Sequence, residues 1–397
     1  MDGTSRVTKV SDASLGSVAA LCKAMDWKLA EFDELLAWDP DLRFKRKKIP
    51  KADGGQREVF VPHWRLRIFL RRLNKRLLAN PDVIQWPNYL FGSIPSKGVM
   101  DAGPLGTDYV ACASRHCGAR SVLKIDVANF FGSISVNQVS DIFRSFLKYP
   151  KRLSDAIASL CCADGYLAQG APTSSYLANL VFWSREHRVV ARLKRKGLIY
   201  TRYVDDITVS SKRHDQDFSL ALSLVDSMLT AADLTRSTAK TRVLRSGADA
   251  ILVHGLRVEY PRPRIPKEEV GRVRSAVAAI ENFATEPNFR LKRKYRKMFN
   301  RCLGRVNKLS RVQDPRHPKL LKRLRRIEPL PHPSELGNCR RWSLRLASSF
   351  PTRGDRFFFK KSCFRLRERL NLLAKSYPDE ARKIRSQVAM VANSYEK

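Results

Sequence analysis

Residues 198–210 have the sequence LIYTRYVDDITVS. Two runs rich in β-branched and aromatic residues, 198–203 and 207–210, flank a short turn that contains Asp205 and Asp206. This pattern predicts a β-hairpin with two adjacent carboxylates at its tip. Because neighbouring carboxylates repel each other unless a cation lies between them, the hairpin tip is a candidate cation site. The alternative is an ordinary polar turn, in which Asp is a favoured residue.

A third carboxylate comes from an earlier segment of the chain. Residues 121–126 read SVLKID, which predicts a buried strand that ends at Asp126. Nucleotidyl transfer uses two divalent ions held by carboxylates, one to activate the attacking hydroxyl and one to stabilise the leaving pyrophosphate. Asp126, Asp205 and Asp206 are therefore the candidate metal ligands, with Mg²⁺ as the expected ion and Mn²⁺ as a substitute.

The chain is strongly basic. Among its 397 residues, Lys and Arg number 75 against 38 Asp and Glu, a formal net charge of +37. Such an excess predicts a polyanionic partner, and nucleic acid is favoured over lipid because the N-terminus offers no amphipathic anchor or acylation motif. No apolar run reaches about 18 residues and no secretory signal is visible, so we expect no membrane partner and a cytoplasmic location. The eight scattered cysteines lack the spacing of a zinc site and are expected to be reduced thiols.

Four short motifs occur in the order in which reverse transcriptases carry them in their palm domain. They are DVANFF at 126–131, QGAPTS at 169–174, YVDD at 203–206 and KT at 240–241. The chain thus resembles the reverse transcriptases over roughly residues 44–258. The resemblance implies an α+β right-hand polymerase with fingers, a palm built on an antiparallel sheet, and a helical thumb. It also implies RNA-templated DNA synthesis in which Asp126 and Asp205 bridge both metal ions. Asp206 would support one ion, and Val127 would belong to the same metal site.

The same resemblance implies a nucleotide-binding site. Lys51 and Arg57 would hold the triphosphate from the fingers, while Gln169 and Gly170 would bring backbone close to the incoming nucleotide. Phe131 would clash with a ribose 2′ hydroxyl and so favour deoxynucleotides. Each residue has a plainer alternative, namely a core aromatic, a simple helix start, or a solvated surface cation.

A later lysine, Lys240, matches the lysine that follows the palm strands in the family. The resemblance makes it a candidate proton donor to the leaving pyrophosphate. In a chain with 75 basic residues, an ordinary surface lysine is the alternative.

Two further segments resemble elements of the retron-type reverse transcriptases. CASRH at 112–116 resembles their Asn-Ala-x-x-His element with Cys112 in place of Asn, and VHGL at 253–256 resembles Val-Thr-Gly with His254 in place of Thr. The resemblance implies that His116 and His254 contact RNA, with a satisfied histidine as the alternative for His116. It also implies a structured noncoding RNA as template and primer, a DNA product, and a role in antiphage defence with an effector protein as a further partner.

Patterning along the chain predicts how these parts are organised. Helices are expected at 14–25, at 63–78, from 172 to beyond 182 and around 218–229, a strand at 58–61, and a strand pair at 241–258. The expected domains are fingers at 1–120 with finger elements around 135–165, a palm at 121–260, a helical thumb at 261–330 and a basic helical extension at 331–397.

The thumb contains the basic sequence LKRKYRK at 291–297. Lys292, Arg293 and Arg296 are expected to contact the backbone of an RNA-containing duplex from one face of a helix. A solvated charged face is the alternative.

Two other functions stay open from the sequence. One is a protein-primed or template-independent polymerase with the same fold. The other is a non-catalytic RNA-binding scaffold, which predicts tolerance of Asp205→Asn and Asp206→Asn and a broken set of carboxylates. All three carboxylates are present, which argues against the scaffold. The number of subunits is left open.

Overall fold

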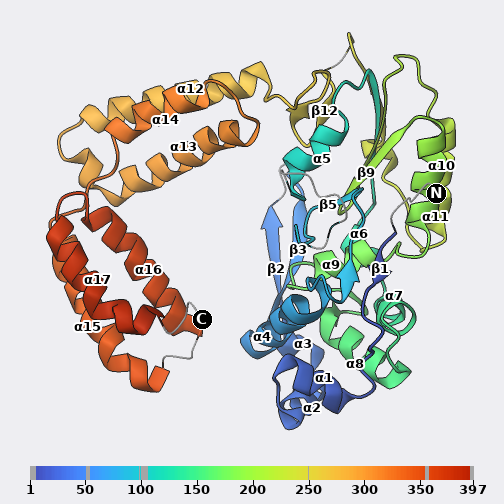
Figure 1. The fold of residues 1–397 in the computed structure, drawn as a ribbon, viewed down its shortest axis with the longest axis horizontal. Helices are drawn as coiled ribbons and strands as arrows, with labels where there is room; N and C mark the ends of the chain where they lie inside the picture. Colours follow the sequence, from blue (N-terminus) through green and yellow to red (C-terminus); the bar gives the residue numbers. More distant parts are fainter. Residues whose placement is uncertain are drawn as a thin grey trace. The chain divides into compact units, whose positions relative to one another are not determined.

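The structure is a computed structural model that describes residues 6–50, 54–97, 99, 106–248, 250–353 and 357–393. The chain divides into two compact units, Met1–Arg264 and Ile265–Lys397. Figure 1 shows the first as a mixture of strands and helices and the second as helices alone.

A five-stranded sheet forms the centre of the first unit, with the strand order β11-β6-β10-β9-β5. Its strands are β5 (Leu90–Phe91), β6 (Ser121–Asp126), β9 (Ile199–Tyr203), β10 (Asp206–Ser211) and β11 (Arg242–Arg245). The predicted hairpin is confirmed as β9 and β10, which pair antiparallel. The predicted strand at 121–126 is confirmed as β6, which pairs antiparallel with β10 on the other side.

Helices pack on this sheet through apolar side chains. Those nearest the site in sequence are α9 (Ser174–Leu180), α10 (Glu186–Arg195) and α11 (Ser219–Thr230). Leu177, Val190 and Val225 belong to the same buried core as Ile207 and Val209 of β10. The helix predicted from Pro172 is shorter than expected, because residues 168–174 first make two tight backbone turns and the helix ends before Phe182. This close-packed core holds the sheet, and with it the hairpin tip, in a fixed position.

The N-terminal part of this unit contains helices and a two-stranded ribbon. Its elements are β1 (Thr8–Lys9), α1 (Val18–Met25), α2 (Leu29–Ala37), α3 (Pro40–Arg43), β2 (Phe44–Pro50), β3 (Gln56–Pro62), α4 (Trp64–Leu73), η1 (Asn74–Leu78) and β4 (Ile84–Gln85). The helix predicted from residue 14 begins at Val18, because the Ser17 hydroxyl caps it by accepting from the Ala20 amide. Strand β2 escaped prediction because its exposed sequence KRKK has low β-propensity.

Short elements complete the unit. They are α5 (Tyr109–Arg115), α6 (Phe130–Ser133), α7 (Val136–Asp141), η2 (Ile142–Phe146), α8 (Lys151–Cys161), β7 (Cys162–Ala163), β8 (Tyr166–Leu167), η3 (Thr238–Lys240), β12 (Leu252–Val253) and β13 (Leu256–Arg257). The strand pair predicted at 241–258 is wrong in its pairing. Strand β11 pairs with β6 of the central sheet, whereas β12 and β13 form a separate hairpin around His254.

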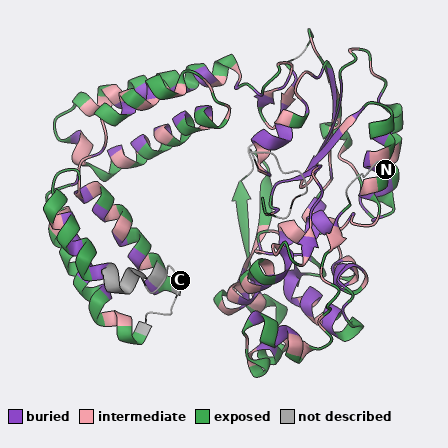
Figure 2. Cartoon of the chain, in the orientation of Figure 1, coloured by how far each residue is buried: buried purple, intermediate pink, exposed green. Residues whose placement is uncertain are grey.

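The second unit is built from η4 (Phe289–Leu291) and six helices in the part that the structure describes. These helices are α12 (Lys267–Thr285), α13 (Arg293–Arg311), α14 (His317–Arg326), α15 (Ser334–Arg353), α16 (Phe357–Leu373) and α17 (Pro378–Asn393). Ion pairs Lys308–Glu269 and Arg323–Glu281 tie α13 and α14 to α12. Helices α15, α16 and α17 enclose a core of their own, which includes Leu346, Leu366, Leu370 and Ile384. Figure 2 shows buried residues on the inward faces of these helices and exposed residues outside.

Two further observations bear on expectations from the sequence. All eight cysteines are free, as predicted. Among the described residues, none of the helices combines the length and the apolar character that a membrane crossing requires.

Candidate active site

Seven of the residues predicted for catalysis or nucleotide binding line one cavity of about 360 Å³ in the first unit. These are Arg57, Asp126, Val127, Phe131, Gln169, Asp205 and Lys240. They come from the β2–β3 ribbon, the end of β6, helix α6, the loop before α9, the β9–β10 turn and η3. Residues separated by up to about 180 positions in the sequence are therefore neighbours in space.

The sheet register brings the carboxylates together. Asp126 ends β6 and Asp206 begins β10, and the two residues are direct cross-strand partners. Asp205 lies in the turn beside them, and its carbonyl accepts a hydrogen bond of 3.1 Å from the Val127 amide. Burial raises the pKa of Asp205, and the nearby Asp126 and Asp206 raise it further. Burial also raises the pKa of Asp206. These shifts mean that the cluster favours an added positive charge.

Two lysines supply positive charge to this cluster in the structure. Lys240 Nζ lies 2.9 Å from Asp126 Oδ2, and Lys124 Nζ lies 3.5 Å from Asp206 Oδ2. Within the described ranges, no group of three or more His, Cys, Asp or Glu side chains is drawn together as a metal site. The oxygen donors nonetheless have the chemistry that Mg²⁺ prefers, and their mutual repulsion fits a site for a hard cation. The sequence did not single out Lys124.

A buried ion pair supports the turn from below. The Arg202 side chain is fully buried and bonds both oxygens of Glu186, at 2.6 and 2.7 Å. Its remaining donors reach Asn179 and, at 2.9 Å, the carbonyl of Val204. This network was not predicted from the sequence. The sequence does contain a sign of this network. Arg202 stands in a strand otherwise made of β-branched and aromatic residues, and a buried arginine needs an acidic partner.

The turn itself holds a strained residue. Val204 has φ of 59°, a left-handed conformation that a β-branched residue rarely adopts. The bond from Arg202 to its carbonyl helps hold it there. Strain of this kind persists where the surroundings over-determine the backbone, and it is common at functional sites.

The predicted nucleotide-binding residues fall into different settings. Phe131 is partly buried and lines the cavity, whereas Phe130 is buried and stacks on Phe182. The Gln169 carbonyl accepts a 2.7 Å hydrogen bond from the Phe60 amide of β3, which joins the motif to the ribbon. Gly170 has φ of 103°, and a Cβ there would lie 3.3 Å from the Phe60 carbonyl.

Gly170 therefore permits close packing of this loop against β3. It does not line the cavity itself. Arg57 does line the cavity, while Lys51 lies outside the described residues.

His116 is not placed to contact RNA. It is fully buried, and its ring nitrogens lie 2.7 Å from the hydroxyls of Ser210 and Thr201. Burial lowers the pKa of His116 to about 3, so the ring is neutral. The structure corrects the predicted RNA contact in favour of the alternative, a satisfied buried histidine that ties α5 to β9 and β10.

His254 is mostly buried beside the hairpin. Its ring packs on Tyr203, its Nδ1 lies 3.6 Å from Asp206 Oδ2, and its Nε2 lies 3.2 Å from the Cys112 sulfur. This places His254 next to a carboxylate of the cluster rather than on an open RNA-binding face. Its expected RNA contact stays a prediction without support from these contacts.

The three basic residues predicted for the thumb lie together in the second unit. Lys292, Arg293 and Arg296 line a cavity of about 340 Å³. Lys292 and Arg293 are exposed, whereas Arg296 is half-buried and pairs with Glu335 at 3.4 Å. Lys292 and Arg293 are therefore accessible to an anionic ligand, whereas Arg296 contributes to an ion pair between helices α13 and α15.

Comparison with known proteins decides the family. Residues 49–278 match the family described as reverse transcriptase (RNA-dependent DNA polymerase). The chain belongs to the reverse transcriptase family. It is 40% identical over 321 residues to the Retron Ec48 reverse transcriptase of Escherichia coli, covering 81% of this chain and 78% of that protein. It is 28% identical to the Retron Se72 reverse transcriptase of Salmonella heidelberg, covering 76% of each. The chain is thus a reverse transcriptase of the retron type.

Membership of the family confirms two predictions. The fold is that of a right-hand polymerase, and the enzyme is an RNA-directed DNA polymerase. Reverse transcriptases depend on divalent metal ions in general, which agrees with the carboxylate cluster. Among solved structures, apo telomerase from Candida tropicalis aligns with a TM-score of 0.41 and 10% identity, over 81% of this chain and 69% of that one.

Proposed function

We propose that this reverse transcriptase copies a cognate structured noncoding RNA into DNA by two-metal nucleotidyl transfer, with that RNA also serving as primer. Antiphage defence is the role that its retron-type kinship suggests. The observation that carries the proposal is the cavity that Asp126, Asp205, Phe131, Gln169, Arg57 and Lys240 line together. Asp206 adjoins it as the cross-strand partner of Asp126. Its relatives are named retron reverse transcriptases, which supports a retron-type noncoding RNA as the template.

The carboxylates would hold the metal ions. Asp126, Asp205 and Asp206 would be the carboxylates that hold them, with Val127 at the same place. Bound Mg²⁺ would lower the pKa of the attacking 3′ hydroxyl and stabilise charge on the leaving pyrophosphate. The register of β6 against β10 fixes the spacing of these side chains, because both strands are buried in the sheet. Lys240 and Lys124 would then move away from the carboxylates they pair with.

The other cavity residues would position the nucleotide. Arg57 and Lys51 would hold the triphosphate through charge-assisted hydrogen bonds. Phe131 would fill the space beside the sugar, which disfavours a 2′ hydroxyl. The flexible, largely exposed Lys240 could swing from Asp126 to donate a proton to pyrophosphate.

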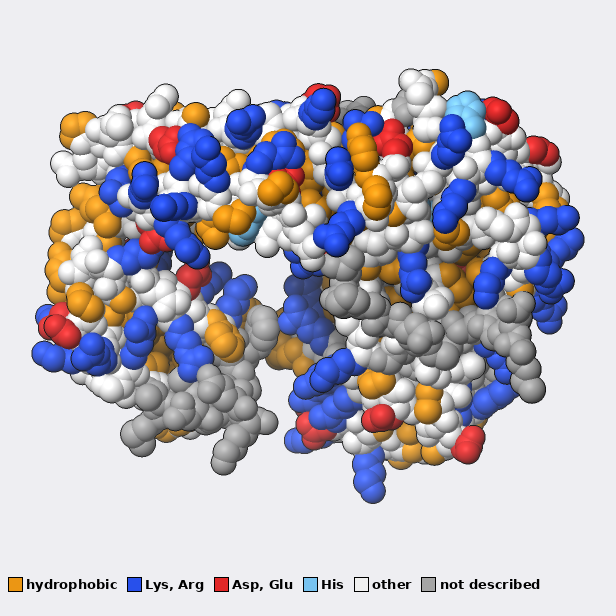
Figure 3. Space-filling model, turned by 45° about the horizontal axis from the view of Figure 1, so that its top comes forward, with side chains coloured by type: hydrophobic (Ala, Val, Ile, Leu, Met, Phe, Trp, Pro, Cys, Tyr) orange, Lys and Arg blue, Asp and Glu red, His pale blue; other side chains and the backbone are white. Residues whose placement is uncertain are grey.

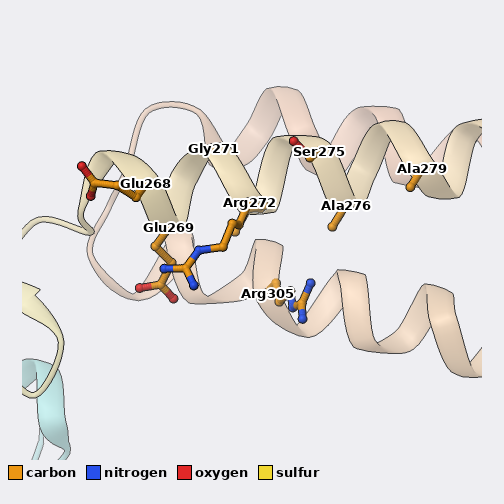
Figure 4. Close-up of a pocket in the computed structure, with 9 residues that line it drawn as sticks. Glu268, Glu269, Gly271, Arg272, Ser275, Ala276, Ala279 and Arg305 are labelled. Carbon is orange, nitrogen blue, oxygen red and sulfur yellow. The ribbon is translucent and has the colours of Figure 1, made fainter.

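The helical second unit would hold nucleic acid. Residues 265–397 carry 34 Lys and Arg against 12 Asp and Glu. An open groove of about 890 Å³ lies along α12. Its lining combines small residues with two glutamates and two arginines: Gly271, Ser275, Ala276, Ala279, Glu268, Glu269, Arg272 and Arg305. Figure 4 shows the short side chains of Ser275, Ala276 and Ala279 on α12 and Arg305 on the neighbouring helix α13. Small residues would let a sugar-phosphate backbone approach closely, with Arg305 of α13 as a phosphate contact opposite them.

The test is purification of the protein from its native host with bound nucleic acid. One half is treated with RNase and the other with DNase, and the surviving strands are sequenced. We expect a defined RNA joined to or paired with complementary DNA. The DNA should be absent from the Asp205→Asn, Asp206→Asn variant.

Asp164→Asn is a matched control for that variant. Asp164 lines the same cavity but pairs with Arg46 at 2.8 Å, away from the carboxylate cluster. It should retain the DNA product. DNA attached to protein or of simple sequence would instead identify a protein-primed or template-independent enzyme. Recovery of RNA alone, without Mg²⁺-dependent nucleotide incorporation, would leave an RNA-binding scaffold.

A further inference from the structure

A second cavity in the first unit has a composition suited to an anion. Its volume is about 390 Å³, and none of its lining residues belongs to the active-site cavity. It is formed by the N-terminal segment with β1, the end of η2 and the turn that leads into α10. Its lining includes the cations Arg6, Lys9, Lys148 and Arg188 and no Asp or Glu.

Most of these cations are not neutralised by the protein. In the part of the chain that the structure describes, the side chains of Arg6, Lys148 and Arg188 make no ion pair or hydrogen bond. Lys9 donates to the Ser14 hydroxyl at 2.7 Å. Like charges gathered around one cavity repel each other, so an anion bound there would be stabilised.

The remaining walls suit a phosphate with an attached apolar group. The cavity lies at the N-terminal end of α10, where His187 and Arg188 form the first turn and no side chain caps the helix. The helix dipole favours an anion at such an end. The amides of Glu186 and Arg188 already donate to the carbonyls of Phe182 and Arg185. The buried Nδ1 of His187 has no hydrogen-bond partner. Trp183, which packs on Phe146 with ring centroids 5.3 Å apart, supplies an aromatic surface.

We propose that this cavity binds a nucleotide unit of RNA, with its phosphate on Arg188, Lys148 and Arg6 and its base or sugar against Trp183. Clustered cations beside an aromatic ring are the usual means of holding single-stranded nucleic acid. The site would anchor a part of the bound RNA that does not enter the active-site cavity. The identity of that RNA rests on the proposed function, whereas the binding of RNA phosphate at this cavity does not.

The binding test compares Arg188→Gln, Lys148→Gln with Arg192→Gln. Arg192 is an exposed cation on the same helix that does not line the cavity, so it controls for loss of surface charge. The probes are labelled single-stranded and hairpin RNA oligonucleotides, titrated at several salt concentrations. We expect the double variant to weaken binding about tenfold and to reduce the salt slope by roughly one per lost phosphate contact. The control should stay within about twofold of wild type.

An equal loss in Arg192→Gln, or an unchanged double variant, would overturn the proposal. A second arm measures binding of labelled ATP. Loss of ATP binding in the double variant with unaltered RNA binding would also overturn it and assign the cavity to free nucleotides. A third arm measures primer extension of oligo(dT) on poly(rA) by the same proteins, which tests polymerase activity at the active-site cavity. Failure of that extension in wild type would count against the proposed function while leaving the RNA-binding comparison valid.

Discussion

His254 Nε2 lies 3.2 Å from the sulfur of Cys112, although 142 residues separate the two in sequence. These are the two positions at which the chain departs from the motifs that it otherwise shares with retron-type enzymes. The other ring nitrogen of His254 lies 3.6 Å from Asp206 Oδ2, so the pair reaches the carboxylate cluster. The two departures are therefore one coupled structural feature, in which a histidine and a cysteine stand together where the resembled motifs have Thr and Asn.

This contact predicts non-additive substitutions. Cys112→Asn alone places a larger polar group in a fully buried position, and His254→Thr alone removes the ring that faces Cys112 and Asp206. Each should lower thermal stability and primer extension. The double variant should recover part of both, with a coupling energy of about 0.5–3 kcal/mol. Additive losses in unfolding and extension assays would show that the residues do not act as a pair.

The buried arginine beneath the turn should be essential for stability. Arg202→Gln leaves the Glu186 carboxylate without its partner, and we expect the free energy of unfolding to fall by about 3–5 kcal/mol. Arg202→Lys should be intermediate because it keeps the charge but loses the two-pronged bond. Urea unfolding measures both, with the exposed Arg192→Gln as control. A loss below about 1 kcal/mol for Arg202→Gln would contradict a supporting role.

The strained turn predicts a separation of stability from activity. Glycine adopts a left-handed φ without strain, so Val204→Gly should remove the backbone strain at this position. It should also make the turn more flexible. We expect the free energy of unfolding to stay within about 1 kcal/mol of wild type, while kcat falls roughly tenfold or more through misplaced carboxylates. Val204→Ala retains the Cβ and should keep more activity. Steady-state extension with dTTP on poly(rA)/oligo(dT) separates the two variants.

The carboxylate cluster should destabilise the metal-free protein. Burial, and the neighbouring carboxylates, raise the pKa of Asp205, so its ionised form is disfavoured in the folded state. The stability that its protonated form contributes is present at low pH and is lost as pH rises through the folded pKa. At pH 7 without divalent ions, Asp205→Asn should therefore raise Tm. We expect this rise in Tm to be about 2–4 °C, which corresponds to a gain of roughly 1 kcal/mol in the free energy of unfolding for a unit of this size.

Added Mg²⁺ should raise the Tm of wild type and have less effect on Asp205→Asn. Asp164→Asn serves as the control, because Asp164 is exposed and paired with Arg46. A lower Tm for Asp205→Asn than for wild type in the metal-free state would show that the charge is already well compensated by Lys240.

Sugar selection can be assigned to one of two adjacent aromatics. Phe131→Ala should lower discrimination against ribonucleotides by about 10–100-fold, because Phe131 lines the active-site cavity. Phe130→Ala should instead destabilise the fold by about 3–5 kcal/mol, since Phe130 is buried against Phe182. Competition between dTTP and UTP measures the first effect and denaturant unfolding the second. Unchanged discrimination in Phe131→Ala would remove this residue from sugar selection.

Much of the site could be predicted because its chemistry is local in sequence. The strand ending at Asp126 and the hairpin carrying Asp205 and Asp206 follow from short runs of apolar, β-branched and aromatic residues and from the turn residues between them. The basic ribbon strand β2, by contrast, forms because it pairs residue by residue with β3, and its own residues give little sign of it. Strand β11 likewise belongs to the central sheet only because β6 offers it a free edge.

The sequence by itself determined the family, the carboxylates and the basic character of the chain, because these depend on residue types in a given order. Only the tertiary structure decided which side chains face each other. It buried His116 between two hydroxyls, joined Arg202 to Glu186 beneath Val204, and placed His254 against Cys112 and Asp206. Hydrogen-bond partners far apart in sequence are chosen by packing around a shared core, and local patterns carry no record of that choice.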